Sequence, residues 1–111
     1  MRPPRAILCG GVRHQFRALV KLGEFEDFLA AASAFNTELA ALGLPRFQVW
    51  VSVFGDLNEV WAEAELTSLD EHWSAFRAAH RQEGFRSAFE AMCSHLVPGS
   101  AHDQVLEPLD I

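Results

Sequence analysis

Positive charge is scarce in this sequence. Of its 111 residues, nine are Lys or Arg and 15 are Asp or Glu, which gives a formal net charge of −6. The basic residues are spread along the chain and form no run. Because contact with a phosphate backbone requires clustered Lys and Arg side chains, we expect no nucleic acid partner.

Cysteine is equally scarce. The two cysteines, Cys9 and Cys93, are far apart, and neither belongs to a CxxC pair or to a spacing with His that is typical of zinc sites. We therefore expect no metal site. The simplest interpretation is two buried thiols in a reducing cytoplasm, and a disulfide is the alternative.

Long hydrophobic runs are absent from the sequence. The apolar patch near the N-terminus, AILCGG, is far too short for a membrane span and weak as a signal peptide. We expect a cytoplasmic protein without a membrane partner. Pro3-Pro4 and Gly10-Gly11 predict an N-terminal arm over residues 1–13, and the length fits one domain over residues 14–111.

Several motifs that identify enzyme classes are missing too. The sequence has no Gly-rich phosphate-binding loop, no GxSxG nucleophile elbow and no HExxH zinc motif. It also has no internal repeat. No motif identifies a reaction, and we expect no bound cofactor.

The stretch from Phe47 to Leu66 does carry a strong pattern, that of a β-hairpin. Apolar and polar residues alternate in two runs, and alternation places successive side chains on opposite faces of a sheet. Gly55 to Asn58 supply residues that suit a tight turn. One face of the second run is wholly apolar and suited to receive helices, with Val60, Ala62, Ala64 and Leu66.

The other face of this hairpin has a mixed character. It carries Trp50 and Trp61 together with Gln48, Ser52 and three Glu side chains. This face is too aromatic for a plain solvated surface and too charged for an ordinary core. A sheet with both faces in use suggests a partner on the second one, and we expect Trp50 and Trp61 at that interface.

Four more elements surround the hairpin. Apolar residues recur at steps of three and four from Phe25 to Leu42, and Ser68 with Glu71 fits a capping box at the start of a second helical region. Gly84 predicts a break or bend in that region. The expected elements are a strand over residues 14–22, a helix over 24–42, the hairpin over 47–66, a broken helix over 69–96 and a last strand within 102–109.

This order, β-α-β-β-α-β, is the plan of an α+β, ferredoxin-like fold with a four-stranded antiparallel sheet. In the usual strand order, 4-1-3-2, the first strand pairs with the third. Arg17 and Lys21 would then share a face with Glu59, Glu63 and Glu65. Opposite charges across an antiparallel pair contribute about 0.2–1 kcal/mol each, so the charge pattern agrees with the topology.

With these residues in place, the chain resembles the dimeric α+β barrel superfamily, and within it the NIPSNAP-type domains. The resemblance covers roughly residues 16–109. It rests on Leu22–Phe28 (LGEFEDF) entering the first helix, on Phe54–Val60 (FGDLNEV) at the hairpin, and on Ser68-Leu69 opening the second helical region.

The resemblance implies a homodimer in which two sheets pack face to face, with Trp50 and Trp61 at the interface. Members of the superfamily include cofactor-independent quinone-forming monooxygenases, haem-degrading enzymes, isomerases and many proteins with no assigned activity. No residue set in this chain selects one of these reactions.

A pocket would open most naturally between the helices and the sheet. His14 faces the helices from the first strand, and the topology brings it near His72, Trp73 and Arg77 at the start of the second helical region. A His with an Arg can bind an anionic oxygen or move a proton. The alternative is that His14 lies near solvent and His72 lies on the exposed side of its helix.

His80 is the third candidate for proton transfer, and a core histidine is the alternative. The superfamily also allows it to ligate haem, although nothing else in the sequence supplies a haem pocket. Six Phe side chains are core by default and are also suited to line a cavity for an aromatic ligand: Phe25, Phe28, Phe35, Phe76, Phe85 and Phe89. Of these, Phe28 and Phe76 are the ones we expect at the ligand. Asn36 is most simply a helix-surface residue, and Asn58 a turn residue.

Three functions follow as hypotheses. The first is a homodimer that binds a small hydrophobic or aromatic metabolite. The second is a cofactor-independent monooxygenase or isomerase acting on a polyketide- or quinone-like substrate. The third is a structural or interaction module. A shaped cavity holding two or more polar groups favours the second hypothesis, whereas a core filled by Phe side chains favours the third.

Overall fold

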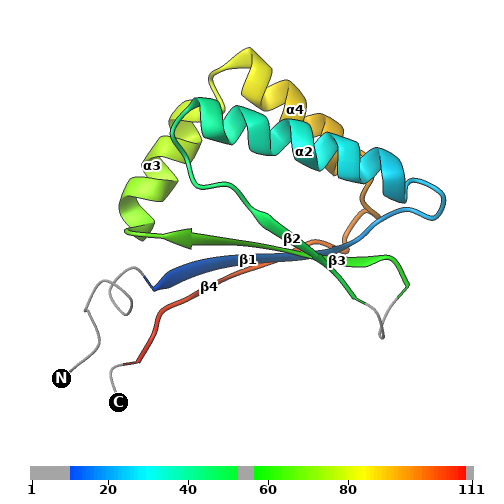
Figure 1. Ribbon diagram of the computed structural model, residues 1–111, viewed down its shortest axis with the longest axis horizontal. Coiled ribbons are helices and arrows are strands. Elements are labelled where there is room, and N and C mark those ends of the chain that lie inside the picture. Colours follow the sequence, from blue (N-terminus) through cyan, green and yellow to red (C-terminus); the bar gives the residue numbers. More distant parts are fainter. Residues whose placement is uncertain (1–10, 53–56, 110–111) are drawn as a thin grey trace.

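The computed structural model describes residues 11–52 and 57–109, which form one antiparallel sheet with helices on one face (Figure 1). The second helical region is divided in two. The expected lead-in before residue 14 lies mostly outside the described residues, as does Cys9. The elements are β1 (Val12–Leu19), α2 (Phe25–Ala41), β2 (Gln48–Val51), β3 (Glu59–Leu66), α3 (Leu69–Ala79), α4 (Glu83–Cys93) and β4 (His102–Leu106).

The sheet has the strand order β2-β3-β1-β4, which is the predicted 4-1-3-2 order read from the opposite edge. All three pairings are antiparallel. The prediction of a ferredoxin-like α+β fold is therefore confirmed. β1 begins at Val12 rather than at residue 14 and ends at Leu19. The expected faces are unchanged, because the alternation continues from Val12 in the same phase.

The core lies between the sheet and the paired helices α2 and α4, which run side by side in Figure 1. Alternate residues of β1 and β3 meet one side of α2, as the sequence predicts. One cluster joins these strands to α2 and to the segment after α4, and a second joins α2 to α3 and α4. Their buried members are Ala18, Val20, Phe28, Ala32, Val60 and Leu96 in the first, and Phe35, Leu39, Ala79 and Phe85 in the second.

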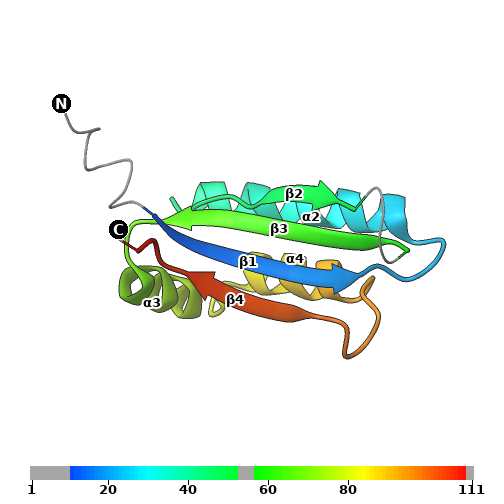
Figure 2. The same cartoon turned by 90° about the horizontal axis from the view of Figure 1, so that it is seen from below.

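The break in the second helical region lies slightly before the predicted position. Ser68 caps α3 by accepting a hydrogen bond from the Glu71 backbone N–H at 3.3 Å. α3 ends at Ala79, and Gly84 belongs to the first turn of α4. The turn at residues 80–82 lets α3 lie across one end of the sheet while α4 follows α2 (Figures 1 and 2).

The other face of the sheet carries no helix among the described residues (Figure 2). Trp50 is 57% exposed there, directly opposite Trp61. The predicted charge pairs are only partly right. Arg13, rather than Arg17 or Lys21, bonds Glu63 and Glu65 at 3.3 Å.

The register explains this difference in charge pairing. Arg17 lies opposite Trp61, and its guanidinium sits 5.5 Å from the centre of an indole ring. This is the geometry of a cation–π contact. Lys21 lies beyond the end of β1, so it has no opposite residue on β3.

Asn36 differs from its predicted role as a surface residue of α2. Its side-chain amide donates to the Phe47 carbonyl at 2.8 Å and accepts from the Phe47 backbone N–H at 2.9 Å. Both bonds reach the residue that precedes β2. Asn36 therefore fixes the start of this edge strand to α2. Asn58, with φ of 59°, is the expected turn residue.

Replacing Asn36 with Leu should lower the free energy of unfolding by about 1–3 kcal/mol, because both polar groups of the Phe47 backbone lose their partner. Urea denaturation measures the change. Thr37→Ala, at the next, exposed residue of α2, is the matched control and should change stability by less than about 0.5 kcal/mol. Equal effects of the two substitutions would contradict the role given to Asn36.

Candidate functional site

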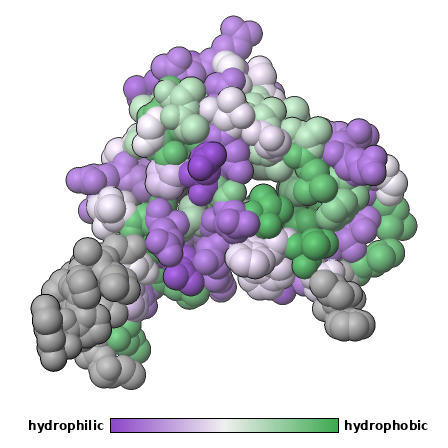
Figure 3. All heavy atoms as spheres, viewed as in Figure 1, coloured by the Kyte–Doolittle hydropathy of each residue, from purple (hydrophilic) through white to green (hydrophobic). Residues whose placement is uncertain are grey.

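A cavity of about 220 Å³ lies between the sheet and the helices. In Figure 3 a hollow is visible between helices and sheet, bordered by apolar residues on one side. The walls come from all four strands and from α2, α3 and α4, and most of the lining side chains are aromatic or aliphatic. The lining residues are His14, Phe16, Phe28, Ala32, Phe35, Asn36, Phe47, Val49, Val60, Trp61, Ala62, Trp73, Phe76, Phe89, Met92 and Asp103.

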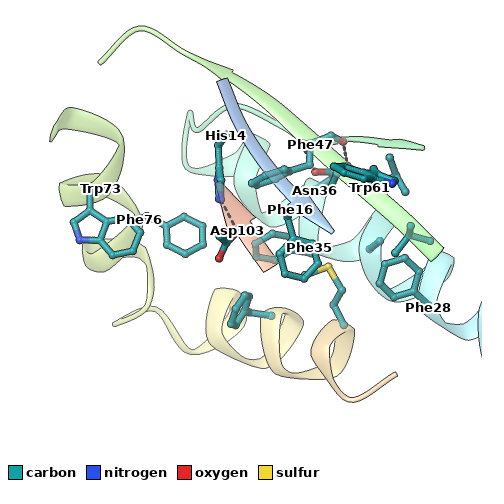
Figure 4. Close-up of a pocket in the computed structure, with 16 residues that line it drawn as sticks. His14, Phe16, Phe28, Phe35, Asn36, Phe47, Trp61, Trp73, Phe76 and Asp103 are labelled. Carbon is teal, nitrogen blue, oxygen red and sulfur yellow. Dashed lines mark hydrogen bonds and ion pairs between the residues drawn. The ribbon is translucent and has the colours of Figure 1, made fainter. Parts of the chain in front are cut away.

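His14 provides a polar group at one end of this cavity (Figure 4). Its Nε2 lies 2.7 Å from Oδ1 of Asp103 on β4, the strand next to β1. The Nδ1 atom of the same ring is buried and has no hydrogen-bond partner among the described residues. The edge of the ring packs against Phe47, with ring centres 5.4 Å apart. His14 is thus held by Asp103 and keeps one buried nitrogen free.

His72 lies beside His14, as the topology predicted, with ring centres 6.1 Å apart. It is 7% exposed, so the alternative that placed it on the exposed side of α3 is wrong. Its Nδ1 is also buried without a partner. Burial, and to a smaller extent the charge of His14, lowers the pKa of His72 below its ordinary value of 6.5. His72 is therefore neutral at pH 7.

The four residues expected at a ligand take different positions. Phe28, Trp73 and Phe76 line the cavity, and Figure 4 shows Trp73 and Phe76 of α3 on one side of the His14–Asp103 pair. Trp73 is half-exposed at the rim. Arg77 is exposed and does not line the cavity, so the structure does not bring it to His14. Of the six Phe, all but Phe25 and Phe85 line the cavity.

His80 lies outside the cavity lining, in an aromatic cluster. Its ring centre is 4.9–5.1 Å from the ring centres of Phe76, Phe85 and Phe89. Its Nδ1 donates to the Phe76 carbonyl at 3.0 Å. These contacts are typical of a core histidine with a satisfied hydrogen bond.

Asp103 is the functional candidate that sequence reasoning missed. It lies opposite Phe16 in the register of β1 and β4, and its side chain reaches His14, which is two residues along β1. The last strand was expected from the sequence, but its register was not. A register that places Asp103 opposite Phe16 also places the Asp103 side chain on the helix-covered face. The sequence pattern of the last strand does not specify this register.

Cys93 carries a free, partly buried thiol and does not line the cavity. Burial, and to a smaller extent the charge of Asp103, raises the pKa of Cys93. A protonated thiol is a poor nucleophile, so proton transfer by imidazole, rather than thiolate attack, is the chemistry that this site supports.

Metal ions and membranes are two further possible partners. In residues 11–52 and 57–109, no group of three or more His, Cys, Asp or Glu side chains is arranged to hold a metal ion. No helix of the same part of the chain is long and apolar enough to cross a membrane.

The pKa of His72 generates a prediction about stability. Because the folded state lowers this pKa, the unfolded chain binds a proton more readily below about pH 6.5. The contribution of His72 to stability is complete above that pH and is lost as the pH falls toward its folded pKa. In His72→Phe, the free energy of unfolding should therefore fall less between about pH 7 and pH 5 than in the wild type.

Chemical denaturation at a series of pH values measures this difference. His102→Gln, at an exposed residue of β4, is the control and should keep the wild-type dependence. The same dependence in His72→Phe and the wild type would show that burial of His72 does not govern it.

The fold has counterparts among solved structures. No protein-family model and no curated protein matches this sequence. A NIPSNAP family protein from Agrobacterium tumefaciens aligns with a TM-score of 0.73 at 16% identity, over 89% of this chain and 86% of that chain. A NIPSNAP domain protein from Burkholderia xenovorans aligns with a TM-score of 0.75 at 12% identity, over 89% and 95% of the two chains.

A third similar structure is an enzyme. SnoaB, a cofactor-independent oxygenase from Streptomyces nogalater, aligns with a TM-score of 0.67 at 21% identity, over 90% of this chain and 94% of that chain. At such identities the likeness concerns the fold, and the resemblance drawn from the sequence is confirmed at that level. This chain therefore shares the α+β, ferredoxin-like fold of these NIPSNAP and oxygenase structures.

Proposed function

We propose that this protein binds a small hydrophobic or aromatic metabolite in the cavity between the helices and the sheet. The observation that carries the proposal is the cavity itself, about 220 Å³ in volume with aromatic walls on several sides. Ligand sites in proteins are mostly apolar concavities with a few placed polar groups. Such sites usually have volumes of about 300–1,000 Å³. This cavity is smaller, so it suits a ligand of only one or two rings.

Short side chains at two positions keep the cavity open. Ala32 of α2 and Ala62 of β3 both line the cavity, surrounded by larger aromatic residues. A longer side chain at either position would extend into this space. A core filled by Phe side chains would favour an interaction module, and the open space at Ala32 and Ala62 argues for ligand binding instead.

A second candidate is an enzyme, a cofactor-independent monooxygenase or isomerase. The observation that favours it is the His14–Asp103 pair, because proton abstraction requires a base held in place within an apolar site. The fold of SnoaB, described as a cofactor-independent oxygenase, is consistent with such a reaction. Binding remains our first proposal, since it requires only the cavity.

We further propose that the open face of the sheet is the interface of a homodimer. On this face, β1 carries Arg13 and Arg17. The neighbouring strand, β3, carries Glu59, Glu63 and Glu65. A two-fold axis allows the basic strand of one copy to meet the acidic strand of the other. The exposed Trp50 adds the aromatic content that is typical of interfaces. A cytoplasmic location stays a prediction from the sequence.

Filling the cavity provides a test of ligand binding. A panel of one- and two-ring aromatic compounds, screened by thermal shift and tryptophan fluorescence, should yield ligands that stabilise the wild type. Ala32→Leu should weaken their binding about tenfold or more, because the added side chain occupies the cavity. Ala34→Leu, at an exposed position of α2, is the control and should bind normally. Equal affinity of the Ala32→Leu variant and the wild type would contradict the proposed site.

The interface has its own test. Trp50→Glu should convert the dimer to a monomer, because it buries an unpaired charge against the partner's sheet. Light scattering coupled to size exclusion measures the mass. Trp73→Glu is a matched control, since Trp73 is 53% exposed and Trp50 is 57% exposed, but Trp73 lies on α3. A Trp50→Glu variant that stays dimeric, or a monomeric wild type, would reject this interface.

A further inference from the structure

The two halves of α3 are fixed to the rest of the protein in different ways. In the second half, Phe76 and Ala79 pack in the apolar cluster that joins α3 to α2 and α4. Residues 69–75 contribute no side chain to either apolar cluster, and His72 is the one buried residue among them. Because buried contacts set the free energy of local opening, His72 is the residue that holds the first half of α3 in place.

The first half of α3 also forms part of the entrance to the cavity. Trp73 lines the cavity and is half-exposed at its rim, on one side of the His14–Asp103 pair (Figure 4). Movement of residues 69–75 away from the sheet therefore widens the entrance at Trp73.

His72 meets the sheet through a pair of imidazole rings. Its ring centre lies 6.1 Å from that of His14 on β1. Its Nδ1 atom is buried and has no hydrogen-bond partner among the described residues. A neutral ring fits such a site at a modest cost. A protonated ring carries a charge and two N–H donors, and its burial is much less favourable unless an acceptor or a counter-charge is present.

No such counter-charge acts on His72 within the part of the chain that the structure describes. Burial, and to a smaller extent the charge of His14, lowers the pKa of His72, and no carboxylate raises it. Asp103 bonds Nε2 of His14, so it offsets the charge of that ring instead. The other charged groups of the neighbouring elements are paired on the opposite face of the sheet (Arg13, Glu63 and Glu65) or exposed on α3 (Asp70, Glu71 and Arg77).

We propose that the contact between His72 and His14 is a pH-sensitive gate to the cavity. At neutral pH the uncharged ring of His72 stays buried and holds residues 69–75 over the entrance. As the pH falls below about 6.5, where a solvated histidine binds a proton, protonation favours the conformation in which His72 reaches water. The first half of α3 then opens more often, and ligands enter and leave faster. This control of ligand exchange rests on the proposed ligand binding, whereas the movement of α3 does not.

Hydrogen exchange of the backbone N–H groups measures the movement of α3 without a ligand. After correction for the pH dependence of chemical exchange, residues 69–75 should open up to about tenfold more often at pH 5.5 than at pH 7.5. The reason is that each pH unit below about 6.5 favours the protonated, open form about tenfold. Residues 69–75 should also exchange faster than α2, because they open without unfolding of the core.

Three variants show whether His72 governs this opening. His72→Phe keeps a buried ring without a titrating group, and it should remove the pH dependence of exchange in residues 69–75. His80→Phe is the matched control, because His80 directly follows α3 but its Nδ1 already bonds the Phe76 carbonyl at 3.0 Å. It should keep the wild-type dependence. If His72→Phe does not fold, His14→Phe should weaken the dependence, since the charge beside His72 is removed.

A neutral fluorinated ligand, 4-fluoroanisole, tests the consequence for the cavity. Its dissociation rate, measured from the width of its fluorine NMR signal, should rise by a similar factor from pH 7.5 to pH 5.5 in the wild type. In His72→Phe the rate should stay within about twofold. Because the compound has no ionisable group, the change in pH acts on the protein alone.

The outcomes separate this inference from the proposed function. Exchange of residues 69–75 that does not depend on pH, or that depends on it equally in His72→Phe, would overturn the gate and leave the cavity as a ligand site. A dissociation rate that ignores pH while residues 69–75 open would show that ligands enter elsewhere, which also overturns the gate. Failure of 4-fluoroanisole to bind would count against the proposed ligand class, while hydrogen exchange would still decide the movement of α3.

Discussion

The division of the sheet into two unlike faces is the constraint on which the rest of this structure depends. Side chains along β1 and β3 point alternately to opposite sides. Ala18, Val60 and Ala64 meet the helices, whereas Arg17 contacts Trp61 on the other face, and Trp61 also borders the cavity. The hydrophobic effect drives the first face under α2 and α4. The second face keeps charges and indoles together, which suits a partner better than water or a helix.

The cavity arises from the way in which the helices cover the first face. The turn after Ala79 directs α3 across one end of the sheet, while α4 lies along α2. Ala32 and Ala62 line the cavity with short side chains, which leaves space between these layers. The same turn brings His72 over the end of β1, where His14 lies. One break in a helix therefore shapes both the cavity and its polar end.

His14 and Asp103 form the polar end of the cavity. Burying polar side chains in an apolar site is unfavourable unless they are hydrogen-bonded. A hydrogen-bonded His–carboxylate pair is common, and His95 with Glu24 provides another in this chain. The pair at His14 differs because His14 and Asp103 both line an apolar cavity, whereas His95 and Glu24 do not.

Much of the fold was determined by the sequence by itself, because alternation, helical periodicity and the Ser68 cap are local signals. They predicted the order of elements, and the usual strand order of the ferredoxin-like plan then predicted the pairing of β1 with β3 and the proximity of His14 to His72. Tertiary structure alone decided the role of Asn36, the contact of Arg17 with Trp61, and the arrival of Asp103 at His14. Each of these depends on a strand register or on a loop position. A shift of one residue in register reverses which side chains face the helices, and no local pattern in the chain specifies that alignment.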